Sequence, residues 1–101
     1  MDTYVIIRRN GWRTADDLAA AAERSTAEGS RMPDDIAWIR SYVLAERDGS
    51  LGTVCIYQAS SPEAVRAHAA AAGLPVDEIV KVADTVVVRP DPVAAAASKV
   101  S

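Results

Sequence analysis

The sequence predicts one small α+β domain whose strands and helices follow the order βαββαβ. Three observations support this prediction. Helix-capping residues stand at Thr14 and Ser61, the pair Asp48-Gly49 separates two strand-like segments, and apolar runs lie before, between and after the two helical segments. A chain of 101 residues has the size of a single domain.

The first strand is expected at residues 4–9, where a short apolar run ends in charge and meets a turn at 10–11. Thr14 can accept hydrogen bonds from the free N–H groups at the start of a helix. The pattern therefore predicts a first helix over residues 14–29, and Gly29 is expected to end it.

A β-hairpin is expected next in the chain. Residues 36–44 and 53–57 are rich in strand-forming side chains. Between them lies the segment 46–50, whose Asp48-Gly49 pair is typical of a tight turn between antiparallel strands.

The second helix is expected to begin at Ser61, with Pro62 in the first helical position, where its missing N–H costs nothing. Gly73 is expected to end this helix. The valine-rich run at 79–88 then predicts the last strand.

Two right-handed strand–helix–strand crossovers joined by a hairpin give a four-stranded antiparallel sheet with both helices on one face, which is the ferredoxin-like arrangement. We expect residues 1–89 to form this domain. Pro90 and Pro92 break the last strand, so residues 90–101 are expected to form a flexible C-terminal tail.

Both faces of the predicted sheet are apolar. In the first strand Tyr4 and Ile6 point to one side and Val5 and Ile7 to the other. Two helices can cover only one face, and a large bare apolar face is unusual on a monomer. The pattern therefore predicts a homodimer formed through the open sheet face, a dimeric α+β barrel.

Charge and composition exclude several classes of protein. The net charge of −3 argues against nucleic acid as a partner, because duplex binding needs clusters of cations. The densest basic group is Arg8, Arg9 and Arg13, which we interpret as a solvated strand end. A single cysteine excludes an internal disulfide. Neither a signal peptide nor a membrane span is expected, so the predicted location is the cytoplasm.

Several segments, taken in order, resemble a domain-of-unknown-function family that includes a small bacterial nickel-binding protein. They are Trp38, Ser-Tyr-Val at 41–43, Cys-Ile-Tyr-Gln-Ala at 55–59, Glu-Ala-Val-Arg-Ala-His at 63–68 and Gly-Leu-Pro at 73–75. The resemblance implies a ferredoxin-like fold, dimers formed through the sheets, and binding of nickel or another divalent transition metal. Some relatives carry Asp and His on the first strand, where residues 6–9 here read Ile-Ile-Arg-Arg.

The predicted metal ligands are Cys55, in the third predicted strand, and His68, in the second predicted helix. A thiolate and an imidazole both suit nickel, zinc or copper. The alternative is structural: Cys55 would be a small core residue and His68 a hydrogen-bonded, partly buried one.

Trp38, Arg40, Tyr42 and Tyr57 are the predicted residues of a ligand pocket. Arg40 lies between Trp38 and Tyr42 on a mostly apolar face, so it needs a carboxylate partner or an anionic ligand. The alternative is that the three aromatic side chains belong to the core or to an interface.

Three functions remain open at this point. The first is a homodimer that binds a transition metal of the nickel type or a small ligand. The second is a small dimeric enzyme, an isomerase or a monooxygenase, with an aromatic-lined pocket. The third is a non-catalytic dimerisation or interaction module.

Overall fold

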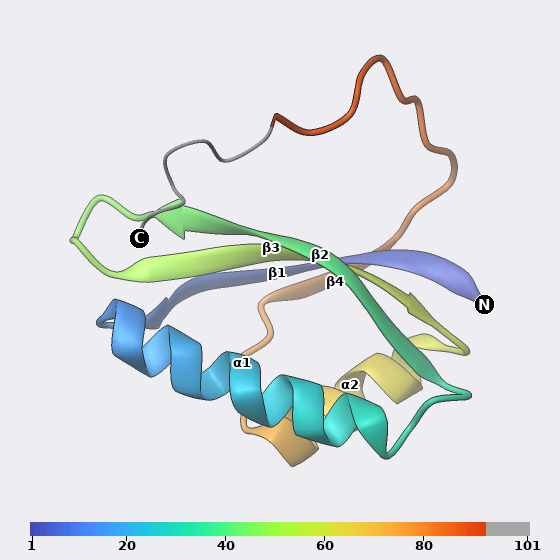
Figure 1. Ribbon diagram of the computed structural model, residues 1–101, viewed down its shortest axis with the longest axis horizontal. Helices are drawn as coiled ribbons and strands as arrows, with labels where there is room; N and C mark the ends of the chain where they lie inside the picture. The colour runs from blue at the N-terminus through green and yellow to red at the C-terminus, as the bar shows by residue number, and fades with distance from the viewer. Residues whose placement is uncertain (93–101) are drawn as a thin grey trace.

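The computed structural model describes residues 1–92, and the part of the predicted tail from residue 93 onward lies outside the described residues. The element order is βαββαβ, as predicted (Figure 1). The elements are β1 (Asp2–Trp12), α1 (Ala15–Ser30), β2 (Ile36–Ala45), β3 (Leu51–Ala59), α2 (Pro62–Ala72) and β4 (Glu78–Lys81).

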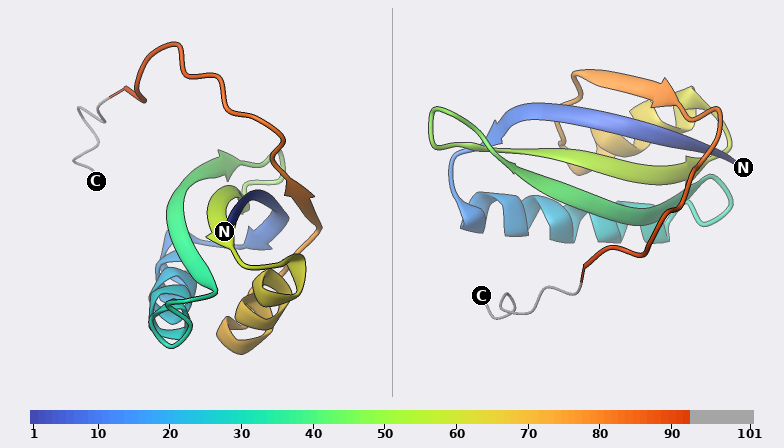
Figure 2. Two further views of the ribbon diagram at one scale, coloured as in Figure 1. Left: turned by 90° about the vertical axis from the view of Figure 1, so that its right-hand side faces the viewer. Right: turned by 90° about the horizontal axis from the view of Figure 1, so that it is seen from above.

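The four strands form one antiparallel sheet in the order β2-β3-β1-β4. Both helices cover the same face, and the other face carries no helix (Figure 2). The ferredoxin-like prediction is therefore confirmed. Neither helix within residues 1–92 is long and apolar enough to cross a membrane.

The predicted helix starts are confirmed by their hydrogen bonds. Thr14 Oγ1 accepts from the N–H of Asp17 at 3.1 Å, and Ser61 Oγ accepts from the N–H of Ala64 at 3.1 Å. Gly73, with φ of 68°, ends α2 as predicted. The predicted end of α1 is wrong, because the helix does not end at Gly29.

Helix α1 continues through Gly29 to Ser30, and Arg31 follows it. Arg31 has φ of −86° and ψ of −9°, and its N–H donates to the carbonyl of Glu28 at 3.1 Å. The helix thus ends in a right-handed turn, which needs no left-handed glycine.

Strand β4 is much shorter than the predicted strand at 79–88. Its residues pair with Tyr4–Ile7 of β1, and the last bond joins the N–H of Val82 to the carbonyl of Thr3 at 2.9 Å. Because β1 begins at Asp2, the chain beyond Val82 has no strand to pair with. It crosses the open face of the sheet instead, as Figure 2 shows.

A bulge in β2 changes which of its side chains share a face. Trp38 pairs with Tyr57, but Arg40 pairs with Ile56, so Ile39 is an extra residue without a partner on β3. Trp38 therefore faces the helices and Arg40 faces the open side. Simple alternation, which placed both on one face, is wrong at this position.

A clamp formed by Glu46 joins the end of β1 to the β2–β3 turn. Its carboxylate accepts from Arg9 Nε at 3.0 Å, from Arg9 Nη2 at 2.7 Å and from the N–H of Asn10 at 2.8 Å. The Glu46 side chain is 4 % exposed. The hydrogen bond from Arg9 is the main reason that the pKa of Glu46 lies below its usual value.

We expect Glu46→Gln to weaken the fold at neutral pH and to flatten its acid dependence. Since the folded pKa of Glu46 is lowered, its stabilisation is present above the ordinary value of 4.5 and is lost as the pH falls through the folded value. Urea midpoints at pH 7 and pH 3 measure this. The control is Glu28→Gln, because Glu28 makes only a 3.9 Å pair with exposed Arg31. Equal pH dependence in Glu46→Gln and wild type would contradict the prediction.

Candidate functional site

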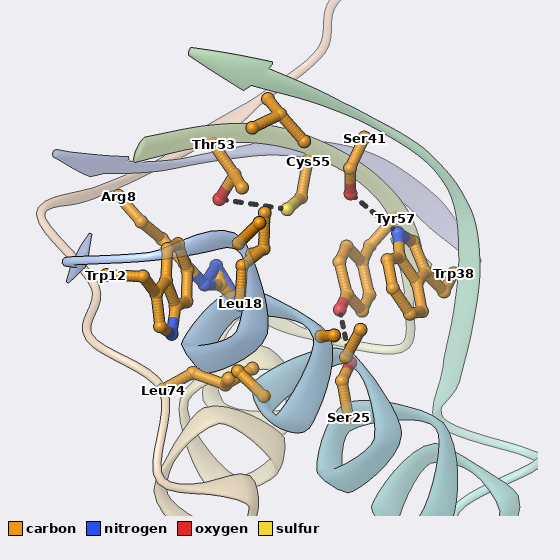
Figure 3. A pocket seen from close by; sticks show the side chains of 15 residues that line it. Arg8, Trp12, Leu18, Ser25, Trp38, Ser41, Thr53, Cys55, Tyr57 and Leu74 are labelled. Atoms are coloured by element: carbon orange, nitrogen blue, oxygen red, sulfur yellow. Dashed lines mark hydrogen bonds between the residues drawn. The ribbon is translucent and has the colours of Figure 1, made fainter. Parts of the chain in front are cut away.

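A cavity of about 290 Å³ lies between α1 and the face of the sheet that the helices cover. We call it the α1–sheet cavity. In Figure 3, Arg8 and Trp12 lie at one end, and Trp38, Tyr57 and Ser25 lie at the other. The cavity thus extends along the helix rather than across it.

The alanine content of α1 explains why this space exists. Ala15, Ala19 and Ala22 line the cavity, and Leu18 is the largest side chain that the helix contributes. Alanine side chains are too short to fill the gap between a helix and a sheet, which are usually about 10 Å apart. The lining is therefore apolar with few polar groups, which is typical of small-molecule sites.

Arg8 is the charged residue of the cavity lining. It is 1 % exposed, its Nη1 has no hydrogen-bond partner, and it makes no ion pair within residues 1–92. The interpretation of Arg8 as part of a solvated strand end is wrong. Arg8 follows Tyr4 and Ile6 at alternate positions, so the pleat of β1 turns it inward with them.

The polar groups at the other end of the cavity are hydrogen-bonded to one another. Tyr57 Oη and Ser25 Oγ share a hydrogen bond of 3.0 Å, and Trp38 Nε1 donates to Ser41 Oγ at 2.8 Å. The rings of Trp38 and Tyr57 are stacked, with centroids 6.1 Å apart. Burial raises the pKa of Tyr57, while the Arg8 cation acts in the opposite direction.

The four predicted ligand residues lie on two faces of the sheet. Trp38 and Tyr57 line the α1–sheet cavity. Arg40 and Tyr42 lie on the open face and bind Asp91, with Arg40 Nη1 at 2.6 Å and Tyr42 Oη at 2.8 Å from its carboxylate oxygens. Arg40 thus has the carboxylate partner that its position required, and these four residues do not form one pocket.

The two predicted metal ligands are both buried on the helix-covered side. The thiol of Cys55 donates to Thr53 Oγ1 at 3.4 Å, and His68 Nε2 bonds the carbonyl of Ser25 at 2.9 Å. A carbonyl can only accept, so Nε2 donates this bond, and Nδ1 has no hydrogen-bond partner.

These donors do not fit a nickel ion. Within residues 1–92, no three side chains of His, Cys, Asp or Glu come together in a group that could hold a metal. A dimer formed through the open face would not help, because Cys55 and His68 lie on the opposite side of the sheet in each subunit. Their role as metal ligands stays a prediction.

A family model described as "Nickel responsive protein SCO4226-like" matches residues 4–82. The chain belongs to this SCO4226-like family. The match covers every strand and helix from Tyr4 of β1 to the end of β4, so it includes the α1–sheet cavity.

Two solved structures match the chain, and the first of them supports the same fold. The crystal structure of SCO4226 from Streptomyces coelicolor A3(2) matches with a TM-score of 0.66 at 21 % identity, covering 83 % of this chain and 99 % of that chain. SnoaB, described as a cofactor-independent oxygenase from Streptomyces nogalater, matches with a TM-score of 0.42 at 16 % identity, covering 89 % and 100 %. The comparison with curated proteins finds no match.

Proposed function

We propose that this member of the SCO4226-like family is a non-catalytic protein that binds a small organic molecule in the α1–sheet cavity. The observation that carries the proposal is the cavity itself, about 290 Å³ in volume and lined by apolar side chains. An apolar cavity of about 150 Å³ is enough to bind benzene. This cavity suits a molecule of one or two fused rings.

The polar groups of the lining favour binding over catalysis. The hydroxyls of Tyr57, Ser25 and Ser41 are occupied by hydrogen bonds to their neighbours. Arginine side chains stay charged in proteins and are therefore poor general acids or bases, so Arg8 offers the ligand a positive charge. What the cavity offers a ligand is shape, aromatic surface and one positive charge.

We also infer that the protein is a homodimer and that the open sheet face is its interface. The support is the apolar surface on that face, where the exposed fractions of Ile39, Tyr42 and Val80 are 48 %, 46 % and 43 %. Light scattering at micromolar concentration tests this inference. A monomer would contradict it without affecting the cavity, which lies on the other side of the sheet.

The family description raises nickel as a ligand. Because the described donors do not fit the ion, we do not extend nickel binding to this chain. Calorimetry with nickel chloride should therefore show no saturable heat. Saturable heat that disappears in both Cys55→Ser and His68→Gln would restore the metal role.

Filling the cavity should weaken ligand binding. Ala22 lines the cavity, so Ala22→Leu should reduce the affinity for a bicyclic aromatic probe at least tenfold, because the added side chain occupies the ligand volume. The probes are 2-naphthoate and 2-naphthamide, and isothermal titration calorimetry measures their binding.

Ala20→Leu is the matched control, since Ala20 lies on the same helix, is exposed and does not line the cavity. It should bind both probes as wild type does. Failure of wild type to bind either probe, or equal binding by Ala22→Leu, would contradict the proposed function.

A further inference from the structure

We propose that the α1–sheet cavity selects an anion, a small aromatic or aliphatic monocarboxylate whose carboxylate pairs with the guanidinium of Arg8. This inference rests on the proposed function and adds the chemical class of the ligand. Three steps support it: the unmatched charge of Arg8, the engagement of the neighbouring carboxylates elsewhere, and the apolar rest of the lining.

The charge of Arg8 is unmatched in the free protein. Its side chain is fully enclosed, and Nη1 has neither a protein acceptor nor solvent. A buried charge without a partner is strongly unfavourable, and buried cations are normally paired. A binding site accounts for an unpaired buried cation, because the bound ligand supplies the missing partner.

The two carboxylates beside β1, those of Glu46 and Asp77, bind Arg9, which follows Arg8 in the strand. The Arg9 side chain donates two hydrogen bonds to Glu46, and the N–H of Arg9 donates to Asp77. Both acids are therefore partners of Arg9. The Arg9 side chain points away from the cavity, because successive residues of a strand face opposite sides. Within residues 1–92 no carboxylate pairs with Arg8, so a bound ligand can supply its counter-ion.

The remaining lining sets the other features of the ligand. No second cation lines the cavity within residues 1–92, so one negative charge is matched better than the two of a phosphate monoester. Leu18 and Leu74 line the cavity, and Trp38 and Tyr57 lie at the end opposite Trp12 (Figure 3). A flat apolar body carrying one terminal carboxylate fits this distribution.

A pair of isosteric probes tests the inference. Calorimetry at pH 7 should show that wild type binds 2-naphthoate at least tenfold more tightly than neutral 2-naphthamide. Arg8→Gln should remove this preference while the amide still binds, because the apolar walls are unchanged. Arg13→Gln is the control: Arg13 is exposed and lies outside the lining, so the preference should persist.

The outcomes separate the two proposals. Equal affinity of wild type for both probes would overturn the carboxylate inference and leave the proposed function standing. Binding of neither probe would overturn both. Should Arg8→Gln fail to fold, the wild-type protein still decides: by NMR, 2-naphthoate must move the Arg8 Nε–H resonance further downfield than 2-naphthamide does, and equal shifts from the two probes would overturn the inference.

Discussion

Arg8→Met should make the ligand-free protein more stable. Methionine is shorter than arginine but also unbranched, carries no charge, and can pack against the apolar lining around Trp12 and Leu18. Replacing a buried, unsatisfied charge by an apolar side chain is expected to gain about 1–3 kcal/mol. In a domain of this size, each kcal/mol corresponds to a rise in Tm of about 4–8 °C. Urea and thermal unfolding without ligand measure the gain.

The stability advantage of Arg8→Met over wild type should shrink when a carboxylate is present. Wild type gains about 2.7 kcal/mol from a ligand at one hundred times its Kd, and Arg8→Met should gain far less from the same concentration of 2-naphthoate. Exposed Arg13→Met serves as the control and should change stability by less than about 0.5 kcal/mol. A loss of stability in ligand-free Arg8→Met would show that the guanidinium is already satisfied.

Local signals in the sequence were sufficient for the helix starts and the hairpin. Thr14 and Ser61 cap helices through bonds to residues three positions away, so their role is visible without the rest of the fold. The end of β4 depends on where its neighbour β1 begins, and this pairing between distant segments cannot be read from the local sequence of β4. The valines at 86–88 have strand propensity but no partner strand, and they are exposed.

The candidate site was harder to predict, because two of its features are not local. The extra residue Ile39 moves Arg40 and Tyr42 to the face opposite Trp38, and nothing in the sequence marks a bulge there. Alternation along β1 did place Arg8 with Tyr4 and Ile6. The usual exposure of arginine outweighed that signal, and only the space left by the alanines of α1 shows why an inward arginine fits.

Gly52→Ala should be among the most destabilising single substitutions in the chain. A Cβ at Gly52 would lie 2.6 Å from the backbone oxygen of Arg8 and 2.5 Å from Glu46 Oε2. Neither atom can move freely, because one belongs to β1 and the other is held by Arg9 and Asn10. Overpacking of this kind costs about 1–3 kcal/mol, and we expect the upper part of that range in urea unfolding.

Gly29→Ala provides a control of opposite sign. The nearest atom to a Cβ at Gly29 is His68 Nε2 at 3.7 Å, an ordinary contact, and Gly29 lies within α1. Alanine there should therefore gain about 0.5–1 kcal/mol from its better helix propensity. Gly52→Ala with wild-type stability would show that β1 and β3 can separate at this point without cost.

The clash at Gly52 should also weaken carboxylate binding, because it displaces the backbone that carries Arg8. The absence of a side chain at Gly52 lets the Glu46 carboxylate lie against β1 and hold Arg9 outward, while Arg8 stays turned into the cavity. The preference for 2-naphthoate over 2-naphthamide should therefore fall in Gly52→Ala. Val65→Ala separates this effect from instability, since Val65 is buried on α2 away from the cavity and costs stability without moving Arg8. If both variants keep the wild-type preference, the position of Arg8 does not depend on the clamp.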